Sequence, residues 1–210
     1  MPTVLEPSSV LAQAAPRLTV AEFRAMEFDD DDTFFYELLE GNIVRKSAPS
    51  ASHQRVARNI FRALDVHVLA NNLGEVLFAP IDVFLDDENV VQPDVLFIAA
   101  AEQHIVTTDG VQGAPNLIVE IINPSSMKRD RGGKMRVYEH CGVGEYWLVD
   151  IRTRSVEVYV NTDVGGRWDY DLREVFVADK LISTSPVVVN SFTIVDFTMP
   201  LETVFDGVQE

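Results

Sequence analysis

The sequence predicts a mixed α/β fold whose C-terminal part is rich in β-strands. Three observations support this prediction. Between Ala114 and Asp150 the sequence reads as strand, helix and strand. Apolar residues recur at helical spacing from His53 to Asn71, which is typical of a long amphipathic helix. After Asp150, short apolar segments alternate with turn residues, as in β-structure.

The strand–helix–strand unit carries two notable charges. Its first strand is the apolar run Leu117–Ile122, interrupted by a single carboxylate, Glu120. Polar residues after Ile122 can end this strand and cap a helix. A glycine-containing turn then ends the helix, and Glu145–Asp150 reads as a second buried strand. The unit therefore places Glu120 on a strand and Lys134 on the helix that follows it.

Shorter elements surround this unit. Thr19 and Glu22 have the spacing of a capping box, for a helix that runs to about Glu27. Glu40-Gly41 reads as a tight hairpin turn. Strands are expected at Phe34–Leu39, Asn42–Arg45, Glu75–Phe78, Ile81–Leu85 and Val90–Ala99, before a partly helical connection from Ala100 to Gly113. Further strands are expected at Ser155–Val160, Trp168–Phe176, Val187–Val189 and Phe192–Val195, with a turn at Gly165-Gly166 and a last helix at Pro200–Val204.

Composition limits the class of protein. The 210 residues suit one domain at 18–210, preceded by a mobile tail at 1–17 that lacks the charges of a signal peptide. The single cysteine, Cys141, excludes a disulfide framework and favours a reducing cytoplasm, and no apolar run is long enough for a membrane helix. The net charge of −16 is unusual for a nucleic-acid binder, unless acidic residues hold a divalent cation.

Two lone carboxylates on apolar strands suggest such a cation site. Asp94 precedes Val95–Ile98, and Glu120 interrupts the later strand. Mg²⁺ prefers one or two carboxylates together with waters and substrate phosphate, and Lys134 could supply a further cation. The alternative is structural: both acids pair with Arg or Lys at strand ends, while Lys134 lies on a solvated helix face or pairs with Asp130.

An ordered series of motifs makes a resemblance specific. It consists of Phe35–Gly41 (FYELLEG), His53, Gln92–Val95 (QPDV), Ala114–Glu120 (APNLIVE), Pro124–Ser126 (PSS), Asp130, Lys134, Tyr138 and Gly142–Asp150 (GVGEYWLVD). The series resembles the Uma-type family of bacterial endonucleases, within the restriction-endonuclease-like PD-(D/E)XK superfamily. The resemblance extends from about Leu18 to about Phe197.

The resemblance implies a restriction-endonuclease-like core, with a central mixed β-sheet flanked by helices and extra C-terminal β-strands. It also implies a Mg²⁺- or Mn²⁺-dependent endonuclease that cleaves DNA, with Asp94 and Glu120 as metal ligands. One departure stands out, because the standard lysine position, two residues after the acid, holds Ile122. Lys134 is then the expected replacement, and the family pattern carries a lysine there too. Because of this departure, a catalytically weak or inactive protein that acts as a binding module is the alternative.

Other residues are secondary candidates for the site. Glu37 is either a third acid or a charge at the hairpin edge, and Asp82 could reach the site from a neighbouring strand. Asp130 is expected to position Lys134, while Tyr146 is expected in the core, with a hydroxyl that could support the site. His53 is more often a capping or packing residue than a base. The C-terminal strands could extend the sheet or form the interface of a homodimer.

Overall fold

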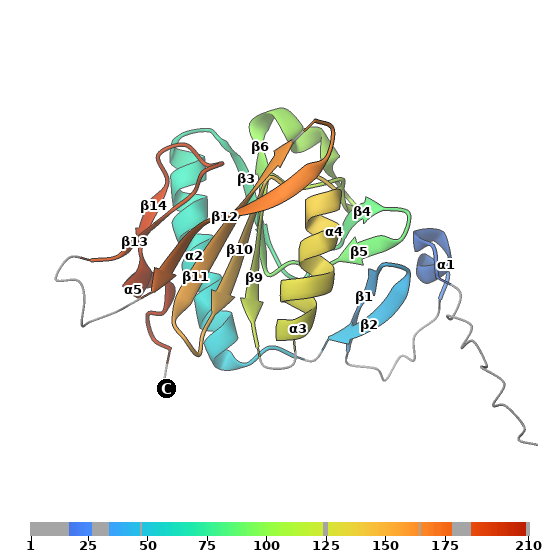
Figure 1. Ribbon diagram of the computed structural model, residues 1–210, viewed down its shortest axis with the longest axis horizontal. Helices are drawn as coiled ribbons and strands as arrows, with labels where there is room; N and C mark the ends of the chain where they lie inside the picture. Colours follow the sequence, from blue (N-terminus) through green and yellow to red (C-terminus); the bar gives the residue numbers. More distant parts are fainter. Residues whose placement is uncertain are drawn as a thin grey trace, which may run out of the picture.

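The computed structural model describes residues 17–26, 34–46, 48–123, 126–163, 165–177 and 186–208. Its centre is a six-stranded mixed sheet in the order β12-β11-β10-β9-β6-β3 (Figure 1). The strands are β3 (Gly74–Phe78), β6 (Val95–Ala99), β9 (Leu117–Ile122), β10 (Glu145–Asp150), β11 (Ser155–Asp163) and β12 (Trp168–Val177). Among these six described strands, only β9 and β10 pair in parallel, since a helical crossover joins them. The predicted fold class is confirmed.

Helices cover both faces of this sheet. On one face lies α2 (Ala51–Ala70), which buries Val56, Ile60, Leu64 and Val68 against the sheet (Figure 1). Burial of each of these side chains contributes about 1.5–3 kcal/mol. On the other face lies the crossover, made of α3 (Met127–Arg129), the π-helical turn η2 (Asp130–Lys134) and α4 (Met135–His140). The crossover and the sheet therefore enclose a second core, separate from the core under α2.

A second sheet packs beside the crossover, in the order β2-β1-β5-β4-β8-β7. Its strands are β1 (Phe35–Leu39), β2 (Asn42–Lys46), β4 (Val83–Asp86), β5 (Asn89–Val91), β7 (Val106–Thr107) and β8 (Gly110–Gln112). The remaining elements are α1 (Val20–Arg24), the 3₁₀ helix η1 (Ala100–Ile105), β13 (Val188–Asn190), β14 (Thr198–Pro200) and α5 (Leu201–Val204). No helix in the described part of the chain is long and apolar enough to span a membrane.

Two predicted strands are wrong. The segment Val90–Ala99 is divided between the two sheets, because the chain leaves β5 and passes through Pro93 before β6 begins. Proline offers no ladder donor, and it marks this crossing. The predicted strand Phe192–Val195 does not form, since the amides of Phe192 and Thr193 donate to the Glu145 carboxylate instead. The strand that pairs with β13 is β14.

Other boundaries differ by a few residues. The capping box of Thr19 and Glu22 is present, but α1 ends at Arg24. The long helix starts at Ala51, capped by Ser50, two residues before the predicted start. The turn at Glu40-Gly41 and the final helix are confirmed. The predicted tail lies outside the described residues, apart from Arg17.

Candidate metal and acid–lysine site

Two acidic residues meet where β6 begins beside the end of β9. Val95 pairs with Val119 in the antiparallel register, so Asp94 and Glu120 are the next pair beyond the ladder. Asp94 Oδ2 accepts a hydrogen bond from the amide of Ile121 at 2.8 Å. This bond fixes the aspartate against the neighbouring strand, and both carboxylates are nearly buried.

Lys134 binds the glutamate from the crossover. Its Nζ donates to Glu120 Oε1 at 2.7 Å and to Glu37 Oε1 at 2.8 Å, and the lysine side chain is fully buried. The hydroxyl of Tyr138 donates to the same Glu120 Oε1 at 2.7 Å. One oxygen of Glu120 is thus held by two donors that lie four residues apart on successive turns of the crossover.

The π-helical turn η2 brings the lysine to this position. Its sequence, Asp130–Lys134 (DRGGK), contains two glycines, and π-turns inside helices are frequent at functional sites. A Cβ on Gly133 would lie 3.0 Å from Leu39 Cδ2, so the missing side chain allows close approach to β1. That approach brings Lys134 within reach of Glu37, which belongs to β1.

Glu37 is a third carboxylate of the cluster. Besides Lys134, its Oε1 accepts from the amide of Gln92 at 2.8 Å and from Lys46 Nζ at 3.3 Å. Its Oε2 is buried, and no residue in the described part of the chain hydrogen-bonds to it. Asp82 lies one step further out, because its Oδ1 accepts from the Gln92 side chain at 2.8 Å. In the described residues Asp82 makes no direct bond to the other acids.

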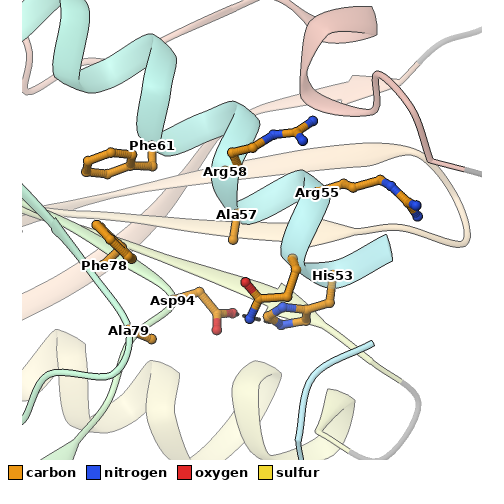
Figure 2. A pocket seen from close by; sticks show the side chains of 9 residues that line it. His53, Arg55, Ala57, Arg58, Phe61, Phe78, Ala79 and Asp94 are labelled. Atoms are coloured by element: carbon orange, nitrogen blue, oxygen red, sulfur yellow. Dashed lines mark ion pairs between the residues drawn. The ribbon is translucent and has the colours of Figure 1, made fainter. Parts of the chain in front are cut away.

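His53 closes the cluster on the side of α2. Its Nε2 lies 3.2 Å from Asp94 Oδ2, and its Nδ1 is buried without a hydrogen-bond partner. The same two residues form one end of a cavity of about 480 Å³ between α2 and β3 (Figure 2). This cavity connects Asp94 with the outside of the molecule.

Asp130 and Tyr146 lie behind the lysine. The Tyr146 hydroxyl donates to the backbone carbonyl of Asp130 at 3.2 Å, and its ring packs edge-on against Tyr138 at 5.1 Å. The Asp130 carboxylate is buried, with Oδ1 3.6 Å from Arg129 Nε. Within the described chain it does not hydrogen-bond to Lys134, so its effect on the lysine is through charge.

Burial and charge set the protonation of the cluster. Burial, together with the charges of Asp94 and Asp130, raises the pKa of Glu120 to about 7, despite the opposing effect of Lys134. Burial alone would lower the pKa of Lys134, but the charges of Glu120 and Glu37 raise it well above the usual value. Burial would raise the pKa of Asp94, yet the bond to His53 lowers it. For His53 the Asp94 bond outweighs burial and raises the pKa.

The donor set fits a hard divalent cation. In the described chain, Asp94 Oδ1 and Glu120 Oε2 accept no hydrogen bond, while the other oxygen of each carboxylate is held in place. Mg²⁺ needs few protein ligands, because waters and phosphate complete its octahedron. No cluster of three or more acidic, His or Cys residues with metal-binding geometry occurs in the described ranges. Asp94 Oδ1 and Glu120 Oε2 are compatible with a magnesium or manganese ion that takes two carboxylate ligands.

Sequence reasoning identified most of these residues and missed three. The structure brings together Asp94, Glu120, Lys134 and Glu37, and places Asp82, Asp130 and Tyr146 around them. It adds Tyr138, Lys46 and Gln92, and it gives His53 a direct contact with Asp94. The position of Tyr138, four residues after Lys134, is a signal that could have been used, since such residues share a helix face.

The central mixed sheet carries Asp94 and Glu120 on neighbouring strands, and the buried Lys134 binds Glu120. Comparison with known proteins gives the family. The family model described as "Uma2: Putative restriction endonuclease" matches residues 20–199, and the chain belongs to this family.

Two further proteins are similar to the chain. A protein of Synechocystis sp., "Uncharacterized protein sll1609", is 26% identical over 144 residues, which is 68% of this chain and 80% of the relative. The crystal structure of "a putative nuclease belonging to DUF820" from Anabaena variabilis superposes with a TM-score of 0.67 at 17% identity. The superposition covers 90% of this chain and 97% of the Anabaena chain, which establishes a shared fold.

Proposed function

We propose that the protein is a Mg²⁺-dependent endonuclease that hydrolyses phosphodiester bonds in DNA. The observation that carries the proposal is the Glu120 carboxylate, which is held on one oxygen by Lys134 and Tyr138 and lies next to Asp94. Membership of a family described as restriction endonucleases supports a nucleic acid as the substrate.

Asp94 and Glu120 are the residues that would hold Mg²⁺ or Mn²⁺. When bound, such a cation lowers the pKa of its water and neutralises charge on a phosphoryl oxygen. Glu120 must be ionised for this role, and its pKa of about 7 puts the required form within reach near neutral pH. The negative charge of the two adjacent carboxylates attracts a divalent cation to the site.

Lys134 is proposed as the cation that orients the attacking water. Its ammonium has three N–H donors, and Glu120 and Glu37 accept two of them. Tyr138 and Lys134 together fix the rotamer of Glu120, whereas His53 and the Ile121 amide fix Asp94. The chain's own contribution is thus a preorganised pair of carboxylates, which costs no reorganisation during the reaction.

The test combines metal binding with cleavage. Mn²⁺ is titrated by calorimetry into the wild type, Glu120→Gln and Asp94→Asn, and the same samples are assayed for plasmid nicking. Glu174→Gln is the control, because Glu174 is exposed and lies on β12. We expect both signals to vanish in the two site variants and to persist in the control. Nicking that survives in both site variants contradicts the proposal.

One observation favours a second function, a nuclease-fold protein that binds without cleaving. Ile122 occupies the standard lysine position and is buried in the core, while Lys134 is shielded from solvent. Under this alternative, Mn²⁺ binding is absent and circular dichroism still shows a folded protein. Binding together with nicking excludes it.

A homodimer is proposed as the assembly that would cut both strands, because closed twofold dimers are the commonest oligomers. In the described part of the chain β12 is the edge strand of the central sheet, and it exposes Leu172 and Val175 by 47% each. Exposed apolar edge strands favour pairing with another chain. Sedimentation equilibrium of the wild type and Leu172→Lys tests the proposal, and a wild-type monomer contradicts it.

A further inference from the structure

The cavity beside Asp94 contains an aromatic platform. Phe61 of α2 and Phe78 of β3 pack edge-to-face, with ring centroids 4.6 Å apart and an interplanar angle of 61°. Both line the cavity, and Phe78 is 57% exposed (Figure 2). A large apolar ring at the end of a strand would ordinarily be covered, so its exposure inside a cavity points to a ligand with a flat apolar face.

Arginines accompany the rings. Arg55 and Arg58 line the cavity, and Arg62 follows on the same side of α2 at helical spacing. In the described residues none of these three guanidinium groups forms an ion pair with a carboxylate. In a chain of net charge −16, a group of unneutralised arginines next to a cavity is a local site for an anion.

We propose that this cavity holds an unpaired nucleotide of DNA, with its base stacked on Phe78 and a neighbouring phosphate bound by Arg55 and Arg58. The inference rests on the proposed function and extends it to a substrate class, since Asp94 lies at the other end of the same cavity (Figure 2). The preferred substrate is accordingly DNA with a single-stranded segment at the cleavage site.

The chemistry favours a nucleotide that has left the duplex. Within a duplex both faces of each base are covered by stacked neighbours, so an unpaired base alone can present a face to Phe78. Stacking on an aromatic ring is tolerant of base identity, and arginine adds phosphate contacts. A cavity of about 480 Å³ is in the size range of small-ligand sites.

The experiment measures binding separately from cleavage. A fluorescent thymidine oligonucleotide and a fluorescent hairpin duplex are titrated with the full-length protein in EDTA, and anisotropy gives both Kd values. We expect the single strand to bind more tightly. Phe78→Ala should weaken single-strand binding by about fivefold or more, with little change for the duplex, while Phe78→Tyr should retain it.

Control variants separate the cavity from general effects. Phe192→Ala removes a ring of similar exposure (51%) that does not line the cavity, and it should leave both Kd values unchanged. Arg58→Gln should reduce the salt dependence of single-strand binding by about one counterion. Phe78 is more than half exposed, so its truncation should not unfold the protein, which a thermal melt verifies.

The outcomes distinguish the two proposals. Equal affinity for both DNAs, no DNA binding, or equal effects of Phe78→Ala and Phe192→Ala would overturn the nucleotide site. Metal-dependent nicking could still be found in each of those cases, which would leave the proposed function intact. Selective binding that depends on Phe78, without nicking, would support the nucleotide site and contradict the endonuclease.

Discussion

Replacing Lys134 with methionine tests the buried cluster most directly. The substitution keeps an unbranched side chain but removes the ammonium that bonds to Glu37 and Glu120 at 2.8 and 2.7 Å. Both carboxylate side chains are almost inaccessible, at 0% and 5% exposure, so water cannot replace the lost partner. Removing one member of a buried ion pair costs about 3–5 kcal/mol. That is a large share of the roughly 5–15 kcal/mol by which domains are stable.

The effect should depend on pH. Without the ammonium, the pKa of both carboxyls rises, because Lys134 helps to lower the pKa of Glu37 and opposes the rise of the pKa of Glu120, which already lies at about 7. A folded-state pKa above the unfolded value gives stability that is present at low pH and lost as pH rises through the folded pKa. We therefore expect Lys134→Met to be more strongly destabilised at pH above about 8 than near pH 6.

Urea unfolding monitored by circular dichroism at the two pH values measures both effects. Lys128→Met is the matched control, because Lys128 is exposed on the same crossover and should cost less than about 0.5 kcal/mol. Adding Glu120→Gln to Lys134→Met should restore part of the loss, because it removes the buried carboxylate that has lost its charged partner, whereas Glu37 still pairs with Lys46. If Lys134→Met lowers the free energy of unfolding by less than about 1 kcal/mol at both pH values, Lys134, Glu37 and Glu120 do not form a buried ion-pair cluster.

Three further predictions concern the same region. Tyr138→Phe should cost about 1.5–3 kcal/mol in urea unfolding, because the hydroxyl bonds to a buried carboxylate, whereas Tyr159→Phe, which loses a bond to the half-buried Glu157, should cost less. The increase in Tm on adding Mn²⁺ should grow as pH rises through about 7, as Glu120 deprotonates, and a pH-independent increase would contradict its role as a ligand. Gly132→Ala should raise Tm, because its added Cβ has room beside Arg136. Gly133→Ala should give a lower Tm than Gly132→Ala, because its added Cβ would lie 3.0 Å from Leu39 Cδ2. Equal Tm values for the two variants would show that the Leu39 side chain moves aside at no cost in stability.

The regular elements of the fold follow from the sequence because each has a local signal. Periodic apolar residues define α2, and the apolar runs define β9 and β10. The division of Val90–Ala99 was not predictable from periodicity, since both halves are apolar and buried. Which sheet each half joins is decided by long-range pairing with β1, β4 and β9. The loop at Phe192 likewise depends on Glu145, which is 47 residues away.

The site was predictable where a residue violates its local pattern. Glu120 is a charge in an apolar strand, and such a charge needs a partner. Lys46 carries no comparable signal, and Gln92 is marked only by its place in the QPDV motif. Their contacts with Glu37 arise because β1 lies between β2 and β5. His53 begins a helix, where histidine is common, and its contact with Asp94 depends on the placement of α2 across the sheet.

The position of Lys134 shows how a second segment of the chain can bring a cation to Glu120. Side chains two residues apart on a strand share a face, so a lysine at Ile122 would emerge on the same side of β9 as Glu120. Ile122 instead packs in the core beneath the crossover, among Tyr138 and Leu148. Lys134, which belongs to η2, donates a hydrogen bond to Glu120 Oε1. The crossover, and not β9 itself, therefore supplies the cation that pairs with Glu120. Ile122, which stands at the usual lysine position, extends the apolar core that excludes water from Lys134. The exclusion of water strengthens the bonds of Lys134 to Glu37 and Glu120.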